Sequence, residues 1–198
     1  PVGVSANRLL VVGVSIKDSA STVTAVTYGG VPLTFLGAGG ADDQSARVEL
    51  WYLTAPASGW APISVSLSGT TDVIGGAMTF SGVDQAMPLG GFVASGSTGN
   101  GAADPAVVVT NAGGELVLAA LAVVGNPGLL MPAAGQQQKW IRFRGSSMSG
   151  AGAIAAGADT VTMRWTKTSN AKWAIGAVAI KAATVTGPPL DKFQVSFT

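Results

Sequence analysis

The sequence predicts an all-β protein, a jelly-roll-like antiparallel β-sandwich, and three observations lead to this fold class. Short apolar runs recur along almost the whole chain and are separated by glycine, proline, asparagine or aspartate, which is the spacing of strands and turns. Several runs alternate with the two-residue period of a strand, whereas no stretch keeps a helical period over three turns. The 198 residues suit one large sandwich domain.

We expect about a dozen strands. Gly29-Gly30 suits the positive φ angles of a tight hairpin turn and separates the second strand from the third. Apolar side chains occupy both faces of residues 48–53, and the longest apolar stretch, residues 116–124, is typical of a buried strand. The runs with clear bounds are residues 8–15, 23–28, 31–36, 47–53, 63–67, 72–80, 106–110, 115–123, 138–143, 160–165 and 173–181. The side chains expected in the core include Leu9, Val11, Leu50, Leu118 and Ile175.

The remaining segments are predicted to be turns and loops. Residues 88–104 and 125–137 are rich in glycine, alanine and proline, which predicts long surface loops where a binding function would most naturally lie. Residues 150–152, Gly-Ala-Gly, indicate a turn or a tight approach of two backbones. Trp165 and Trp173 flank a polar turn, so we expect them to lie close together, either as core or rim aromatics or as a platform for sugar stacking.

Charge and composition point to few classes of partner. Eleven basic and ten acidic residues are spread without a block of one sign, so neither a nucleic acid nor an anionic membrane is expected as a partner. No apolar run approaches the roughly 18 residues that span a bilayer, so we expect no membrane insertion. With 11% charged residues, the surface must be covered by small uncharged side chains, a composition typical of extracellular fibres. We therefore expect an extracellular or cell-surface location.

The residue types needed for common enzyme chemistry are scarce. The absence of histidine excludes Ser-His-Asp and Cys-His catalysis and the usual zinc and copper sites, so we expect neither an enzyme nor a cofactor. Glu49, which alternation places on one strand face with Trp51, is the one acid considered for sugar chemistry, and the alternative is an exposed or arginine-paired strand residue. Asp42 and Asp43 form an acidic loop that is either a solvated turn or a source of calcium ligands.

A short cationic and aromatic stripe is the best candidate for contact with a ligand. Trp140, Arg142 and Arg144 alternate onto one face of a predicted strand. Such a stripe could contact acidic surface glycans or a neighbouring subunit. The alternative is a solvated sheet face.

Five motifs, spread over most of the chain, carry a resemblance to a known type of module. They are residues 7–12, 26–34, 49–53, 80–85 and 173–178, which read NRLLVV, VTYGGVPLT, ELWYL, FSGVDQ and WAIGAV. They resemble a secreted β-sandwich module of bacterial and phage-associated proteins, found in tandem or multi-domain surface proteins. The motifs are strands and tight turns, so the resemblance implies the fold rather than a function. It also implies a further alternating strand before the NRLLVV segment.

The C-terminus supplies a strand of this kind. Residues 192–198 alternate perfectly, with Phe193, Val195 and Phe197 on one face. Joined to the N-terminus, they read as the strand, turn and second strand in their expected order. We therefore divide the chain into a sandwich domain at residues 1–182, a proline-containing linker at 183–191 and a C-terminal strand at 192–198.

This strand is expected to fill a groove of the next domain or subunit, beside the strand that starts at Arg8, with Leu9 and Val11 as acceptor residues. A covalent tandem repeat and the exchange of strands between separate subunits both fit the sequence. A tail that folds back onto its own domain, or one without fixed structure, is the alternative.

The expected function is therefore structural. Copies of the chain would join head to tail through the C-terminal strand and form an extracellular filament, stalk or surface fibre. The alternative is a carbohydrate-binding or adhesive module of a surface or phage tail protein, which would use the two long loops with an exposed tryptophan.

Overall fold

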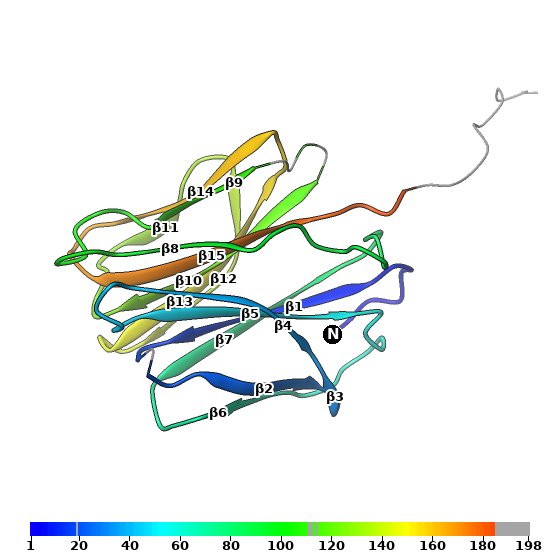
Figure 1. The fold of residues 1–198 in the computed structure, drawn as a ribbon, viewed down its shortest axis with the longest axis horizontal. Coiled ribbons are helices and arrows are strands. Elements are labelled where there is room, and N and C mark those ends of the chain that lie inside the picture. The colour runs from blue at the N-terminus through cyan, green and yellow to red at the C-terminus, as the bar shows by residue number, and fades with distance from the viewer. Residues whose placement is uncertain (19, 111–112, 114, 185–198) are drawn as a thin grey trace, which may run out of the picture.

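The structure is a computed structural model that describes residues 1–18, 20–110, 113 and 115–184. Within this part, the chain forms fifteen strands and no helix, and every pairing between strands is antiparallel (Figure 1). The all-β, antiparallel prediction is confirmed. The jelly-roll connection between strands is not.

Two central sheets face each other. In the first the strand order is β4-β5-β1-β7, and in the second it is β12-β13-β10-β15-β8. The first sheet contains β1 (Leu9–Ile16), β4 (Thr34–Gly40), β5 (Arg47–Thr54) and β7 (Val73–Phe80). The second contains β8 (Val93–Gly96), β10 (Leu116–Val124), β12 (Gln136–Arg144), β13 (Met148–Ala156) and β15 (Lys172–Ile180). Leu9, Leu50 and Met78 meet Leu118 and Val178 between the sheets.

Two smaller sheets cover the outer faces, so the molecule has four layers (Figure 1). The sheet over the first central sheet has the order β3-β2-β6, and the sheet over the second has the order β11-β14-β9. Their strands are β2 (Val23–Tyr28), β3 (Val31–Pro32), β6 (Ile63–Leu67), β9 (Ala106–Thr110), β11 (Leu130–Pro132) and β14 (Thr160–Lys167).

The four layers explain why two strands are apolar on both faces. All eight residues of β1 are buried, and β10 is buried from Val117 to Val123. Each of these strands has a paired neighbour on both edges and a packed layer on both sides. A continuous apolar run suits this position because neither face contacts water. The five predicted core side chains, those of Leu9, Val11, Leu50, Leu118 and Ile175, are fully buried as expected.

The two halves of the chain repeat one topology. The order β4-β5-β1-β7 in the first half matches β12-β13-β10-β15 in the second. The registers match too, because Gly13 of β1 lies opposite Gly76 of β7 as Ala120 of β10 lies opposite Gly176 of β15. Residues of the two halves can therefore be compared position by position.

A β-bulge at the same place in both halves supports this correspondence. In the first half the pairing of β4 with β5 shifts between Phe35 and Gly37, and Gly37 lies opposite Leu50. In the second half the pairing of β12 with β13 shifts between Gln138 and Trp140. A bulge changes the local twist of a strand. In both sheets the bulge lies in the edge strand, β4 or β12, beside the corresponding neighbour, β5 or β13.

Three strands, β8, β11 and β13, were not predicted. Residues 150–152, interpreted from sequence as a turn or a tight approach, lie inside β13. The turn interpretation was wrong, and the tight approach is present: a Cβ on Gly152 would lie 2.2 Å from the indole of Trp140, and one on Gly150 would lie 2.8 Å from Ile74. The predicted loops at residues 88–104 and 125–137 likewise contain the short strands β8 and β11.

Candidate functional site

The structure describes the predicted acceptor residues but not the predicted linking strand. Phe193, Val195 and Phe197 lie outside the residues that the structure describes. Leu9 and Val11 have no exposed surface, and their strand β1 is paired along its length with β5 on one edge and β7 on the other. Both edges of β1 are therefore occupied, and an added strand would have to pair at another edge.

An outer strand offers such an edge. Among the described residues, β6 pairs with β2 on one edge and has no strand on the other. A hollow of about 400 Å³ lies beside the open edge of β6. We call it the β6 hollow, and its walls come from β1, β2, β6, β7, the N-terminal residues and the segment just before β6. They include Val2, Leu10, Trp60, Ile63, Ala77 and Thr79.

The β6 hollow is largely apolar and partly open to water. Trp60 at its rim is 86% exposed and Ile63 is 37% exposed, which is unusual for such large apolar side chains. Sequence reasoning did not single out Trp60. The available signal was Pro62, which precedes β6 at the position where proline is tolerated at the start of an edge strand.

The stripe predicted from sequence is divided between interior and surface. The ring of Trp140 is partly buried and lies against Gly76 and Gly152, which have no side chain to fill that space. Arg142 and Arg144 are exposed. The structure therefore does not bring the indole to the surface beside the two guanidinium groups.

Arg144 already has an acidic partner. Its Nε lies 2.8 Å from Oδ1 of Asp72, and Ser147 donates a hydrogen bond of 2.6 Å to Oδ2 of the same carboxylate. The bond from Ser147, with the charges of Arg144 and Lys17, lowers the pKa of Asp72 below its ordinary value although partial desolvation opposes the shift. Lys17, Asp72 and Arg144 line an open hollow of about 820 Å³ in which most of the charged side chains are paired.

The acidic loop is bridged by a lysine. Nζ of Lys172 lies 2.7 Å from Asp43 and 3.5 Å from Asp42. The hydrogen bond from Lys172, followed by that from Ser45, lowers the pKa of Asp43 to about 2. The ammonium group of Lys172 thus already contacts the carboxylate oxygens that a calcium ion would need as ligands. In the described ranges, no three His, Cys, Asp or Glu side chains converge as metal ligands would.

Glu49 is a structural residue. Its carboxylate is buried and accepts hydrogen bonds from Nε of Arg47 at 2.7 Å, Nε1 of Trp51 at 3.1 Å and the backbone N–H of Val23 at 3.3 Å. A carboxylate held in this way cannot reach a polysaccharide. Of the two interpretations of Glu49, the arginine-paired one is right, although the residue is buried rather than exposed.

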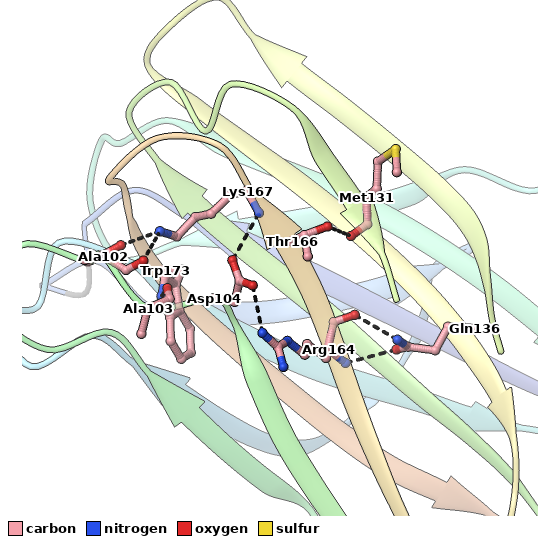
Figure 2. A network of polar contacts seen from close by, with 10 residues as sticks. Ala102, Ala103, Asp104, Met131, Gln136, Arg164, Thr166, Lys167 and Trp173 are labelled. Atoms are coloured by element: carbon pink, nitrogen blue, oxygen red, sulfur yellow. Dashed lines mark hydrogen bonds and ion pairs between the residues drawn. The ribbon is translucent and has the colours of Figure 1, made fainter. Parts of the chain in front are cut away.

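The end of the segment 88–104, where a binding loop was expected, is fixed to the sheet behind it. Figure 2 shows the polar contacts that hold it. Asp104 accepts hydrogen bonds from Nη2 of Arg164 at 3.0 Å and from the backbone N–H of Lys167 at 3.2 Å. Nε1 of Trp173 donates to the carbonyl of Ala103 at 2.8 Å, and Nζ of Lys167 donates to the carbonyl of Ala102 at 3.2 Å.

These contacts hold the end of the segment against the sheet. Burial lowers the pKa of Lys167, and the nearby charge of Asp104 opposes the shift. Trp165 and Trp173 are both buried in the cluster between the second central sheet and its outer sheet. The core interpretation of the two tryptophans is right, and neither ring offers a surface for sugar stacking.

No protein-family model, curated protein or solved structure matches this chain. Over the described residues, the structure has no helix of the length and apolar character needed to cross a membrane.

Proposed function

We propose that this chain is a structural building block of an extracellular filament, stalk or surface fibre, in which copies join head to tail through residues 192–198. The observation that supports the proposal is the β6 hollow beside an open strand edge. An unpaired edge offers backbone donors and acceptors, and an apolar hollow next to it accepts alternate side chains.

The chemistry of the C-terminal strand complements such a site. Phe193, Val195 and Phe197 share one face, and their burial would contribute about 5–9 kcal/mol before ordering costs are subtracted. Because the donated strand and the acceptor edge are different surfaces, the contact is heterologous. Such contacts generate open filaments unless the rotation between subunits closes a ring.

The composition is consistent with an extracellular structural protein. The formal net charge is +1, only 11% of the residues are charged, and there is no cysteine whose oxidation state would matter. The four-layer arrangement buries both faces of β1 and β10.

The test is to image the purified chain and a version that ends at Thr184. We expect the full chain to form filaments in negative-stain images and the shortened chain to remain monomeric. Circular dichroism of both proteins controls for loss of the β fold. A full chain that stays monomeric at high concentration, or a shortened chain that forms the same filaments, would overturn the proposal.

The alternative function, a carbohydrate-binding or adhesive module, is favoured by one observation. Trp60 is 86% exposed at the rim of the β6 hollow, and a tryptophan ring in that position can stack on a sugar. A glycan array followed by a fluorescence titration distinguishes this function. A binder gives saturable quenching that Trp60→Ala removes, whereas a building block gives no response to any glycan.

A further inference from the structure

We propose that residues 193–198 of a second copy pair with the open edge of β6 and fill the β6 hollow. This inference rests on the proposed head-to-tail assembly and names the position of the linking strand. The strand would take the place in the first half of the chain that β9 holds in the second half.

β6 and β14 are counterparts in the two halves. Each precedes the last strand of the repeated sheet order, β7 or β15, and each pairs on one edge with an outer strand, β2 or β11. Val23 lies opposite Leu67 of β6, as Leu130 lies opposite Lys167 of β14. The other edge of β14 pairs with β9. The corresponding edge of β6 has no partner among the described residues.

Side chains around the open edge of β6 are more exposed than their counterparts around the edge of β14 that β9 covers. Ala177 of β15 is fully buried in a cluster with the valines of β9, whereas its counterpart Ala77 of β7 is exposed. Met163 of β14 has no exposed surface, whereas its counterpart Ile63 is 37% exposed. The first half of the chain therefore has the surface that the second half would have without β9.

The C-terminal strand has the side-chain pattern of β9. Val107 and Val109 are the buried residues of β9, and their neighbours are partly or fully exposed. Residues 194–198 read Gln-Val-Ser-Phe-Thr and repeat this alternation, with Val195 and Phe197 at the two buried positions.

The register of β9 on β14 then predicts the contacts of the docked strand. Val107 lies opposite Met163 and Val109 opposite Val161. Transferred to the first half, this register places Val195 opposite Ile63.

The first half also has room for a larger side chain. By the same register, Phe197 would lie opposite Ala61, where the second half pairs Val109 with Val161. Gly75 of β7 is the counterpart of Ile175, and a Cβ there would meet no atom within 4 Å. A phenylalanine in place of a valine therefore meets smaller residues than β9 does.

The N-terminal residues mark where the docked strand would end. Val2 and Gly59 exchange two backbone hydrogen bonds, of 2.9 and 2.8 Å, just beyond Trp60. Pro1 and Val2 form one wall of the β6 hollow. A strand antiparallel to β6 runs from the Leu67 end toward Trp60, so its last residue would arrive beside Pro1.

This direction favours a second copy over the tail of the same copy. The last described residues lie near Gly82, to which Ala183 donates a hydrogen bond, at the same end of the molecule as the N-terminus (Figure 1). A strand of the same copy would first have to cross the length of β6, about 17 Å, and then reverse. Residues 185–192 span at most roughly 28 Å, and this span would also have to cover the two layer spacings, about 10 Å each, between the sheet of β15 and the sheet of β6.

Disulfide trapping tests the contact directly because the chain has no cysteine of its own. One protein carries Ile63→Cys and a second carries Val195→Cys, and the two are mixed and oxidised. Residues directly opposite in an antiparallel pair have Cβ atoms close enough for a disulfide. The matched control is Ser64→Cys, whose side chain points to the other face of β6. A third protein carries both Ile63→Cys and Val195→Cys.

Each outcome decides between the possibilities. A two-copy disulfide in the mixture, at least tenfold more abundant than with Ser64→Cys, supports the inference. An internal disulfide in the protein with both substitutions, without cross-linking in the mixture, means that the tail of the same copy fills the hollow. Filaments without cross-linking at position 63 overturn this inference and leave the proposed function standing. If none of these proteins associates, both this inference and the proposed function are wrong.

A second pair of variants avoids dependence on cysteine chemistry. Ala77→Arg places a charge in the β6 hollow, whereas Val108→Arg places the same charge on the outer face of β9, where the side chain is already 49% exposed. We expect Ala77→Arg to abolish polymers and Val108→Arg to leave them unchanged. Equal behaviour of the two folded variants would contradict the inference.

Discussion

At the scale of single residues, the buried carboxylate of Glu49 joins two layers of the protein. It accepts hydrogen bonds from Arg47 and Trp51 of its own strand and from the backbone of Val23 in the outer sheet. A charge without water is tolerated only when such partners surround it. The glutamate in the middle of β5 is therefore explained by its partners and needs no ligand.

Removal of this carboxylate is expected to destabilise the fold. Glu49→Ala leaves the guanidinium of Arg47 and the indole N–H of Trp51 without their acceptor, and we expect a loss of about 3 kcal/mol in the free energy of unfolding. Glu49→Gln keeps the size and an acceptor oxygen, so its loss should be smaller. Urea denaturation measures both. Equal stability of Glu49→Ala and the unmodified chain would contradict this role.

The pair of Asp43 with Lys172 gives a pH-dependent contribution. The pKa of Asp43 falls from its ordinary 3.8 to about 2 in the folded chain because Lys172 and Ser45 donate hydrogen bonds to it. A lowered folded pKa means that the stabilisation is complete above about pH 4 and is lost as the pH falls toward 2. The effect is modest, since the side chain of Asp43 is 43% exposed and water screens it.

We therefore expect Lys172→Met to be less stable than the unmodified chain at neutral pH. The difference in stability between the two proteins should become smaller as the pH falls from about 4 to about 2. Thermal unfolding at several pH values measures the difference, and carboxyl NMR should show the pKa of Asp43 returning toward 3.8. A stability difference that stays constant through this range would show that the pair makes no pH-dependent contribution.

At the scale of strands, sequence patterns predicted the apolar elements and missed the small-residue ones. β1 and β10 were predicted because a short, continuous apolar run bounded by turn residues is typical of a buried strand. β13 reads Met-Ser-Gly-Ala-Gly-Ala-Ile-Ala-Ala, a composition with weak strand propensity. Gly152 is required by Trp140, a residue of the neighbouring strand, and such a requirement is invisible before the pairing is known.

Two neighbouring glycines of β7 test this requirement. A Cβ on Gly76 would lie 2.1 Å from the indole of Trp140, whereas a Cβ on Gly75 would meet nothing within 4 Å. We expect Gly76→Ala to cost roughly 1–3 kcal/mol or more through overpacking, and Gly75→Ala to be neutral or slightly stabilising. Denaturation of both variants in dilute solution gives the comparison. Similar losses at the two positions would indicate that the strand simply needs glycine.

The candidate site shows the same limit of sequence reasoning. The alternation of residues 192–198 pointed to a strand, but the partner suggested for it, β1, is paired on both edges. Which edge stays open depends on topology, and the topology became clear only from the repeated strand order and the shared bulge. Trp60 and Ile63 attract notice only once their exposure is known.

At the scale of the whole molecule, the proposed contact has a donor end and an acceptor end, and this polarity has a consequence for mixtures. A copy that ends at Thr184 keeps the β6 hollow and lacks the donated strand. A copy with Ala77→Arg keeps the donated strand and has a blocked hollow. Neither can form a chain alone if each contact needs one strand and one hollow.

An equal mixture of these two copies is therefore expected to form a complex of two subunits and nothing larger. The donated strand of the Ala77→Arg copy can enter the hollow of the shortened copy, and no further strand and open hollow then remain to pair. Light scattering after size exclusion should give the mass of two copies of a 19.6 kDa chain, reduced by the missing residues. Either copy added to the unmodified chain should shorten its filaments in proportion to its fraction. Homodimers of one blocked copy, or larger complexes in the mixture, would mean that the subunits meet through a self-complementary surface instead.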